Sequence, residues 1–539
     1  MKKYQLLLLS ILSGLLTGFG WPEYGFTPLL FICWVPLLWM SEELINRREE
    51  FSRYTGFFYT YPGFMVFNLL TTYWIWNATP LGAVLAWVLN SAVMSLAFSL
   101  YFMCRKRLYR GKKAWPVLIA FWVAYEYFHL DWDLSWPWLN LGNGFATKHT
   151  WIQWYEFTGV FGGTVWIWIV NILAFELLFL VVKKRGEKHQ IIRKSLFIVL
   201  AIALPIIISL IRYSTYKEEG AKREVVVVQP NVNPYTEQYA LPPIEITRRL
   251  IKLAAKKTDS NTAFIVCPES SIQEYCWEEQ LPYSPSLFEL RQFLKKYPQA
   301  SFMVGMSTCR MLRPDEKPTP AARKSSFEPN RYFEAYNTAL LIDTTPNLPQ
   351  YHKSKLTPGV EQMPLVKYLK PLEKLAFDFG GTVGSLGIDP ERRVFEPVSK
   401  MAKVSPVICY ESIYGEFVSE FVGNGAQLIF IITNDGWWGD TPGHRQHYSY
   451  ASLRAIETRR CIARSANTGI SAFINQRGDI LQRTKYWEPD VIKASLTLND
   501  TKTFYVRYGD YLGRLAMLLS AGFLLLNFVM KYKDKRLKS

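Results

Sequence analysis

Eight apolar stretches constrain this chain more than any other feature of its sequence. A helix needs about 20 apolar residues to cross the hydrocarbon core of a bilayer. Seven of the stretches precede residue 214 and one lies near the C-terminus. They cover about Tyr4–Phe19, Phe26–Met40, Tyr54–Trp76, Leu81–Cys104, Ala114–Leu130, Phe157–Val182, Ser195–Ile211 and Tyr511–Met530. The sequence therefore predicts a multi-pass α-helical membrane domain of eight helices.

Lys and Arg are concentrated in alternate connections between these stretches. The N-terminus, the second, fourth and sixth connections and the C-terminal tail hold 22 of them, whereas the first, third and fifth connections hold only Lys148. Basic residues flank spanning helices on the cytoplasmic side, so both termini are predicted to be cytoplasmic. The same segments account for almost all of the net charge of +17, and a nucleic-acid partner is not needed to explain it.

The predicted topology divides the chain into three parts. Residues 1–213 form a membrane domain with seven helices, residues 214–508 a domain outside the cytoplasm, and residues 509–539 the eighth helix and a basic cytoplasmic tail. In a bacterium with two membranes, this places the chain in the inner membrane and the middle domain in the periplasm. The first stretch also resembles a signal peptide, but Gly18-Phe19-Gly20-Trp21 is a poor cleavage site, so an uncleaved helix is expected.

Three features of the membrane domain are candidates for function. Glu126 and Glu176 lie within the predicted fifth and sixth helices, where a carboxylate either faces neighbouring helices near an interface or takes part in transport. The loop Trp136–Gly142 is rich in Trp and is predicted at the outer surface. Its Trp side chains form either an aromatic belt or part of a site through which lipid reaches the soluble domain.

Residues 214–508 alternate short β-rich runs with helical patterns, which is typical of an α/β domain. The predicted strands are Glu224–Gln229, Thr262–Cys267, Ala300–Met306, Tyr336–Asp343, Val404–Cys409, Gln427–Thr433, Cys461–Ala466 and Ile470–Asn475. The predicted helices are Pro243–Lys257, Ser286–Tyr297, Tyr414–Val422 and Gly443–Arg459. The polar residues 310–330 are predicted to be a loop or insertion.

Three segments of this domain place a reactive side chain after a β-rich run. They are Val266–Ser271 with Glu269, Tyr351–Glu361 with Lys353, and Val407–Ser412 with Cys409. Sites collect at strand ends in α/β folds, so these three side chains are candidates for one active site. Each alone also has an ordinary interpretation, as a paired carboxylate, a solvated lysine or a buried thiol.

The order Glu269, Lys353 and then Cys409-Tyr410-Glu411 resembles the Glu-Lys-Cys triad of the nitrilase (carbon–nitrogen hydrolase) superfamily. Over its whole length the chain resembles the membrane-bound family of that superfamily, the apolipoprotein N-acyltransferases. Further matching motifs are Gly20-Trp21-Pro22, Trp136-Pro137-Trp138-Leu139, Asn434–Asp440 and Tyr505–Asp510. The resemblance implies a nitrilase-like αββα sandwich for residues 214–508 and the last step of bacterial lipoprotein maturation as the activity.

The resemblance further implies an acyl transfer in two steps. Cys409 would be the nucleophile that takes a fatty acyl chain from a phospholipid as a thioester. Glu269 would be the general base, and Lys353 would stabilise the oxyanion together with the backbone N–H of Tyr410. The acceptor would be the N-terminal amine of the S-diacylglyceryl cysteine of an apolipoprotein. The implied partners are phospholipid, apolipoprotein and the bilayer, with no cofactor.

Residues near the triad have implied supporting roles. Glu361 would hold Lys353, and the step of eight residues between them favours Lys353 over its rival Lys355. Glu411 would support Glu269 or Lys353, or cap the following helix. The implied substrate-binding residues are Trp437, Trp438 and Tyr239, with Tyr235 as an alternative to Tyr239.

The sequence departs from the family after the triad lysine. Thr357–Glu361 stands where the family commonly has Val-Pro-Phe-Gly-Glu, which implies a different loop shape and donor preference. Residues 355–385 and 310–330 are long and rich in Pro or Gly, so they are candidates for a lid.

Other functions fit parts of the sequence. A membrane-anchored amidase or nitrilase would use the same triad with water as the acceptor. A transporter with a periplasmic binding domain would need paired intramembrane charges or inverted repeats, and neither is evident. A catalytically inactive scaffold would not need an intact triad.

The remaining cysteines and the histidines give little sign of a further site. No HExxH or CxxC motif occurs, and His444 and His447 are expected to be helix-surface or pocket side chains. No metal site is predicted. Cys267 and Cys276 could form a disulfide in an oxidising compartment.

Overall fold

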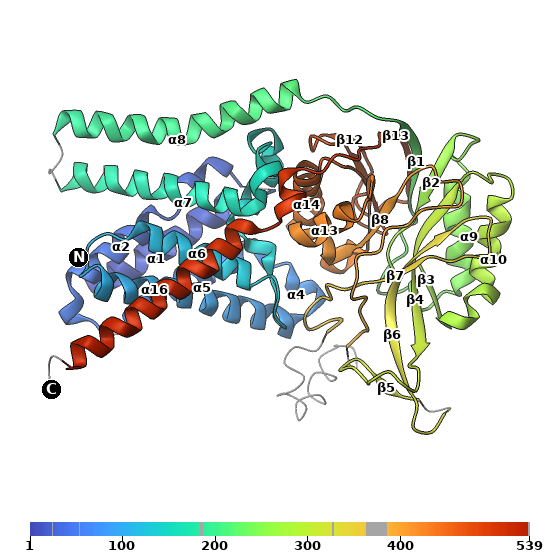
Figure 1. The fold of residues 1–539 in the computed structure, drawn as a ribbon, viewed down its shortest axis with the longest axis horizontal. Coiled ribbons are helices and arrows are strands. Elements are labelled where there is room, and N and C mark those ends of the chain that lie inside the picture. Colours follow the sequence, from blue (N-terminus) through green and yellow to red (C-terminus); the bar gives the residue numbers. More distant parts are fainter. Residues whose placement is uncertain (24, 53, 184–186, 326–327, 363–384, 537–539) are drawn as a thin grey trace. The chain divides into compact units, whose positions relative to one another are not determined.

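The computed structural model describes residues 1–23, 25–52, 54–183, 187–325, 328–362 and 385–536. The chain forms two compact units (Figure 1). We call them the helical unit, which comprises residues 1–76, 80–215 and 510–539, and the α/β unit, which comprises residues 77–79 and 216–509.

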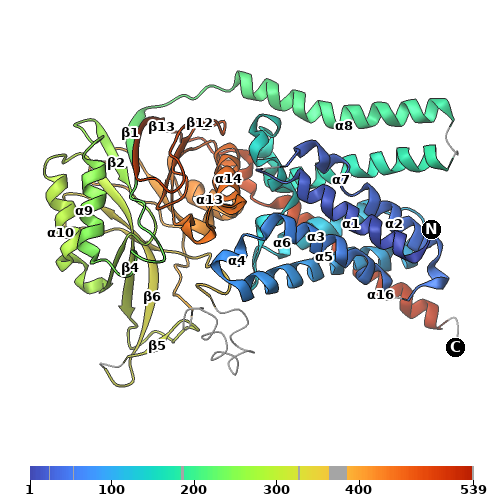
Figure 2. The same cartoon turned by 180° about the vertical axis from the view of Figure 1, so that it is seen from behind.

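The helical unit is built from long helices, of which α7 and α8 lie side by side (Figure 2). Its helices are α1 (Lys3–Gly20), α2 (Val35–Asn46), α3 (Thr55–Thr72), α5 (Pro80–Leu108), α6 (Trp115–Phe128), α7 (Tyr155–Val182), α8 (Lys188–Thr215) and α16 (Tyr511–Arg536). The short helix α4 (Ile75–Ala78) is shared between the two units.

Six helical segments in the described part of the chain are long and apolar enough to cross a membrane. They are Lys3–Gly20, Thr27–Asn46, Pro80–Leu108, Tyr155–Val182, Lys188–Thr215 and Tyr511–Lys533. The predicted spans at α3 and α6 are not among them. Helix α6 has 14 residues, so it is about 21 Å long, less than the roughly 30 Å of a hydrocarbon core. The prediction of a multi-pass helical domain is confirmed, whereas the number eight stays a prediction.

Both intramembrane carboxylates predicted from the sequence have partners inside the helical unit. Glu126 is 1% exposed and accepts hydrogen bonds from Trp122 Nε1 (2.9 Å), Leu141 N (2.8 Å) and Thr164 Oγ1 (2.6 Å). Glu176 accepts from Trp115 Nε1 at 2.7 Å and pairs with Lys194. These contacts give both carboxylates a role in packing the helices.

The Trp-rich loop also packs into the helical unit. Trp138 is buried, with its ring centroid 4.8 Å from that of Trp74 and 5.5 Å from that of Trp136, on which it stacks. Trp138 therefore serves the core of the unit, while the half-buried Trp136 remains a candidate for contact with lipid.

Two β-sheets form the centre of the α/β unit. The larger has the strand order β13-β1-β2-β4-β6-β5, with β3 paired to β4 and β7 paired to β6, and the smaller has the order β12-β11-β10-β9-β8. The strands are β1 (Lys222–Gln229), β2 (Thr262–Val266), β3 (Ile272–Trp277), β4 (Ser301–Met311), β5 (Arg323–Lys324), β6 (Tyr332–Ile342), β7 (Gln350–His352), β8 (Val404–Ile408), β9 (Leu428–Thr433), β10 (Cys461–Ala466), β11 (Ala472–Ile474), β12 (Ile480–Arg483) and β13 (Asp490–Thr497). The helices are α9 (Pro243–Ala254), α10 (Pro285–Leu294), α13 (Gly415–Gly423), α14 (Pro442–Thr458) and α15 (Phe504–Tyr508).

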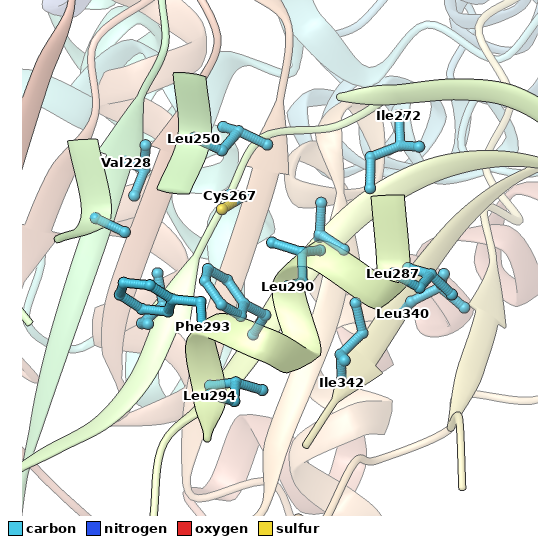
Figure 3. Packing of buried hydrophobic residues seen from close by; sticks show 14 of the residues in the cluster. Val228, Leu250, Cys267, Ile272, Leu287, Leu290, Phe293, Leu294, Leu340 and Ile342 are labelled. Carbon is cyan, nitrogen blue, oxygen red and sulfur yellow. The ribbon is translucent and has the colours of Figure 1, made fainter. Parts of the chain in front are cut away.

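Apolar side chains hold these layers together. Leu250 of α9 and Leu290 of α10 pack against strand residues such as Val228 in one buried cluster (Figure 3). Between the sheets, the rings of Phe264 on β2 and Phe430 on β9 meet edge to face, with centroids 5.2 Å apart. Helices α13 and α14 contact the smaller sheet. The predicted αββα sandwich is therefore confirmed.

Several details differ from the sequence-based expectations. Strands β3, β7, β12 and β13 were not predicted, and residues 310–330 include the end of β4 and the short strand β5 instead of only a loop. Within the two candidate lids, residues 326–327 and 363–384 lie outside the described residues. All seven cysteines are free, so Cys267 and Cys276 form no disulfide.

Candidate active site

Cys409 lies at a sharp bend where β8 ends. It is the first residue of the 3-10 turn η7 (Cys409–Ile413) and has a φ of +49°. This left-handed conformation costs a non-glycine residue about 1–3 kcal/mol, so the surrounding contacts must hold it. The side chain is half-buried, and burial, followed by the charge of Glu269, raises the pKa of its thiol although Lys353 lowers it. Cys409 therefore rests as a thiol and needs a base.

Lys353 follows β7 directly and is buried between two carboxylates. Its Nζ lies 2.9 Å from Glu269 Oε1 and 2.8 Å from Glu361 Oε2. Burial acts to lower the pKa of Lys353, but the charges of Glu269 and Glu361 hold it well above its ordinary value. The lysine is therefore a fixed cation within electrostatic range of Cys409.

Glu269 lies in the loop after β2, beside Lys353. Its Oε1 also accepts from Asn337 Nδ2 at 2.7 Å, and its Oε2 accepts from the backbone N–H of Asn434 at 3.1 Å. Gly305 on β4 permits this arrangement, since a Cβ there would lie 2.6 Å from the Cα of Glu269. Glu269 is 6% exposed, and its side chain is fixed by three donors.

Glu361 closes the cluster from the loop after Lys353. It accepts from Thr357 N at 2.9 Å and from Asn337 Nδ2 at 3.2 Å. Burial acts to raise the pKa of Glu361, but Lys353 brings it below its ordinary value. The rival Lys355 lies elsewhere, with its Nζ 5.1 Å from the centroid of the Tyr414 ring.

Glu411 joins the turn of Cys409 to the segment of Lys353. It is buried and accepts from Ile408 N (2.8 Å), Ser354 N (2.6 Å) and Tyr351 OH (2.7 Å). Burial raises the pKa of Glu411 to about 7 against the effect of these donors. Glu411 thus bridges the two segments and caps the turn.

The other predicted residues surround this centre at different depths. Trp437 is half-buried, accepts from Tyr235 OH at 2.8 Å through its backbone carbonyl, and has its ring 5.2 Å from that of Tyr235. Trp438 is half-buried and meets the ring of His447 edge to face at 5.6 Å. Tyr410 is buried with its ring 5.3 Å from that of Tyr414.

Tyr239 is the most exposed of the predicted substrate-binding residues, at 61%. Desolvation at the hydroxyl, then Tyr275, Glu269 and Glu361, raise the pKa of its phenol to about 12. Its hydroxyl therefore lies within electrostatic range of both carboxylates. Tyr235, which contacts Trp437, and Tyr239 have different neighbours and are not interchangeable.

Sequence reasoning missed Asn337 and the contact that His447 makes with the turn of Cys409. Asn337 donates to both carboxylates from the middle of β6, and His447 of α14 lies 3.2 Å from the carbonyl oxygen of Cys409. The only local signal for His447 was its position shortly after the Asn434–Asp440 motif. Among the described residues, no group of three His, Cys, Asp or Glu side chains is arranged to hold a metal ion.

Comparison with known proteins agrees with this geometry. Residues 13–173 match the profile of the apolipoprotein N-acyltransferase N-terminal domain, and residues 225–505 match that of the carbon-nitrogen hydrolases. The apolipoprotein N-acyltransferase of Chlorobaculum tepidum is 30% identical over 93% of this chain and 92% of its own length. This chain belongs to the apolipoprotein N-acyltransferase family.

Other family members are more distant but equally extensive. The apolipoprotein N-acyltransferase of Geobacter metallireducens is 26% identical over 93% of this chain and 91% of its own. Among solved structures, an amidase from Nesterenkonia sp. superposes with a TM-score of 0.36 at 15% identity, covering 55% of this chain and 97% of its own. As an apolipoprotein N-acyltransferase family member, this chain is a membrane-bound acyltransferase of the carbon-nitrogen hydrolase superfamily.

Proposed function

We propose that this protein transfers a fatty acyl chain from a membrane phospholipid to the N-terminal amine of the S-diacylglyceryl cysteine of apolipoproteins. The observation that carries the proposal is the convergence of Glu269, Lys353 and Cys409, in a chain related over nearly its full length to apolipoprotein N-acyltransferases. The acyl chain passes through a thioester on Cys409.

The first step forms the thioester. Glu269 takes the proton of the Cys409 thiol, and the thiolate attacks the ester carbonyl of the phospholipid. The oxyanion that forms is stabilised by the Lys353 ammonium and by the backbone N–H of Tyr410. When the tetrahedral intermediate collapses, the C–O bond of the ester breaks, and Glu269 gives its proton to the leaving oxygen of the lysophospholipid.

The second step forms the amide. The amine of the diacylglyceryl cysteine attacks the thioester carbonyl, and Glu269 removes a proton from the attacking nitrogen. The C–S bond breaks, and the departing thiolate of Cys409 recovers a proton from Glu269. Glu361 keeps Lys353 charged and in place through both steps, and Glu411 holds the segment that follows Lys353 against the turn of Cys409.

The membrane anchors explain why an amine and not water is the acceptor. Both substrates are held in the bilayer, and residues 1–213 and 509–539 anchor the catalytic domain, residues 214–508, at the periplasmic surface of the inner membrane. Confining enzyme and substrates to one surface raises their effective concentration. Both termini lie in the cytoplasm, as the distribution of Lys and Arg indicates.

Aromatic side chains line the binding site for the lipid substrates. Trp437 and Trp438 lie in the turn after β9, next to the backbone N–H of Asn434 that binds Glu269. Tyr239 is exposed and lies within electrostatic range of the same carboxylate. These rings bind the acyl chains while the triad acts on the carbonyl.

The experiment that tests this function measures acceptor dependence. Purified full-length protein in phospholipid micelles is given a diacylated lipopeptide, and the N-acylated product and any free fatty acid are quantified. The proposal predicts N-acyl product that depends on lipopeptide and is abolished in Cys409→Ala but retained in Cys276→Ala, which removes another half-buried thiol. Release of free fatty acid at the same rate with and without lipopeptide would instead support a hydrolase that uses water.

A further inference from the structure

A chain of buried polar contacts runs from β10 to the carbonyl group of Cys409. Arg464 NH2 donates to Asp435 Oδ2 at 2.6 Å, and Asp435 Oδ1 lies 2.9 Å from His447 Nδ1. On the other side of the imidazole, Nε2 lies 3.2 Å from the carbonyl oxygen of Cys409. Arg464, Asp435 and His447 are each at most 1% exposed, so these contacts are made away from water.

Both ring nitrogens of His447 have polar partners. Asp435 is ionised, because Arg464 and His447 hold its pKa well below the usual range although burial opposes this. A carboxylate can only accept, so the short contact requires a proton on Nδ1. Arg464 NH2 lies 3.1 Å from the same nitrogen, but its shorter contact is to Asp435. Nε2 lies 3.0 Å from Ser412 Oγ and 3.2 Å from the carbonyl oxygen of Cys409, and Ser412 Oγ donates to that carbonyl at 2.7 Å. His447 therefore reaches the carbonyl of Cys409 both directly and through Ser412.

Helix α14 makes a second set of contacts to the same turn. Arg454 lies seven residues after His447, two helical turns further on, and therefore on the same face. Its NH1 donates to the carbonyl of Ile413 at 2.5 Å and lies 3.4 Å from that of Ser412. Its Nε lies 2.7 Å from Glu457 Oε2, which orients the guanidinium. One face of α14 thus binds carbonyls at both ends of η7.

We propose that His447 is a positioning residue for the nucleophile: through Nε2 it contacts Ser412 Oγ and the Cys409 carbonyl and holds the left-handed turn that presents the thiol to Glu269 and Lys353. Arg464 and Asp435 orient the imidazole, and Arg454 holds the far end of the turn. The link to acyl transfer rests on the proposed function, whereas the effect on the Cys409 thiol does not.

The left-handed conformation explains why such a residue is needed. A non-glycine residue adopts a φ of +49° only when its surroundings impose it. The carbonyl of Cys409 also accepts from Ser412 Oγ at 2.7 Å, but Ser412 belongs to the same turn, and its Oγ is itself 3.0 Å from His447 Nε2. His447, on α14, ties this carbonyl and Ser412 to a separate element. Without this contact the turn relaxes to another backbone conformation, and the Cys409 thiol moves away from Glu269.

The test uses three substitutions that divide the two contacts of His447. His447→Gln places an amide group near the position of Nε2 and keeps a polar contact to the turn. His447→Asn places its amide near Nδ1, so it keeps the contact to Asp435 and loses those to Ser412 and Cys409. His447→Leu loses both. His444→Gln is the matched control, because His444 is a buried histidine of the same helix that stacks on Tyr486.

Two rates and one stability measurement are made on the full-length protein. The first rate is alkylation of Cys409 by iodoacetamide without lipid, followed by peptide mass spectrometry, with the half-buried Cys276 and Cys309 as internal references. The second is acylation by phospholipid vesicles. Thermal unfolding is measured in parallel. Loss of the Nε2 contacts leaves buried polar groups of the turn short of a partner, which predicts alkylation and acylation about 10- to 100-fold slower in the Asn and Leu variants. Both rates should stay within threefold of wild type in the Gln variant, and alkylation of Cys276 and Cys309 should be unchanged.

Two results would overturn the proposal. If His447→Asn alkylates Cys409 as fast as wild type, the contact to Cys409 does not position the thiol. If the rates of all three variants fall in proportion to their loss of thermal stability, and alkylation of Cys276 and Cys309 rises, His447 serves only the fold. Failure of wild type to be acylated at all would contradict the proposed function, and the alkylation rates would still decide the role of His447.

Discussion

Replacement of Glu361 by Gln tests the ion pair that holds Lys353. The Glu361 carboxylate has four donor contacts, two from Lys353 Nζ (2.9 and 2.8 Å), one from Thr357 N (2.9 Å) and one from Asn337 Nδ2 (3.2 Å). In Glu361→Gln, the amide NH2 group faces at least one of these donors in either orientation of the amide, so that contact is lost. Removal of one partner of a buried pair costs about 3–5 kcal/mol.

The cost in Glu361→Gln is smaller because Lys353 keeps Glu269 at 2.9 Å. We therefore expect the substitution to cost about 2–3 kcal/mol of the interaction that holds Lys353, which is the upper range for a hydrogen bond to a charged group. At about 1.4 kcal/mol for each factor of ten, the rate of thioester formation should fall about 30- to 150-fold. Lys353 also moves towards Glu269 and engages the base more tightly, which acts in the same direction.

The assay measures single-turnover acylation of the protein by phospholipid, with thermal unfolding in parallel. Glu289→Gln is the control, because it makes the same chemical change in an ion pair whose Arg248 side chain is 64% exposed. Exposed pairs contribute about 0–1 kcal/mol, and this pair joins α9 to α10, so the rate should stay within about threefold of wild type. A Glu361→Gln rate equal to that of Glu289→Gln would refute the idea that Glu361 holds the catalytic lysine.

Three further substitutions probe the neighbouring groups. Lys353→Met should slow thioester formation by about 10²–10³, as expected for loss of an oxyanion donor, and a normal single-turnover rate would contradict its role. Asn337→Leu removes the 2.7 Å donor to Glu269 and should slow acylation about tenfold, whereas an unchanged rate would show that the other donors suffice. Glu411 has a pKa of about 7 in the folded protein against an ordinary value of 4.5. Between these two pH values the folded state therefore binds a proton that the unfolded state does not. The protein loses up to about 3 kcal/mol of stability as the pH rises through this range. The thermal stability of Glu411→Gln relative to wild type should therefore improve from pH 5 to pH 8, and parallel pH profiles would contradict this.

Burial distinguishes the strands that the sequence predicts. β9 is buried along its whole length and is paired in parallel with both neighbours, so its sequence is a continuous apolar run. β12 is exposed throughout and β7 has three residues, so neither leaves a hydrophobic pattern. β13 is recognisable only through its antiparallel register with β1, which lies more than 250 residues earlier in the sequence.

The residues of the candidate site also divide into those that a local sequence pattern reveals and those that it does not. Cys409, Glu269 and Lys353 each stand beside a strand end in a recognisable local motif, and the structure brings them together. Asn337 could not be found in this way, because its position beside Lys353 depends on the pairing of β6 with β7. His447 was interpreted as a surface or pocket histidine, since a lone histidine on a helix carries no sign of the turn it contacts.

The central claim, a thioester on Cys409 formed from phospholipid, can be tested by intact-protein and peptide mass spectrometry. Full-length protein is incubated with phospholipid alone, treated with or without hydroxylamine, and then exposed to a diacylated lipopeptide. The account predicts one acyl group on the Cys409 peptide that hydroxylamine removes, that lipopeptide discharges as N-acyl product, and that Cys409→Ala never acquires. N-acylation of lipopeptide by Cys409→Ala, or by wild type with the acyl group on another residue, would contradict it.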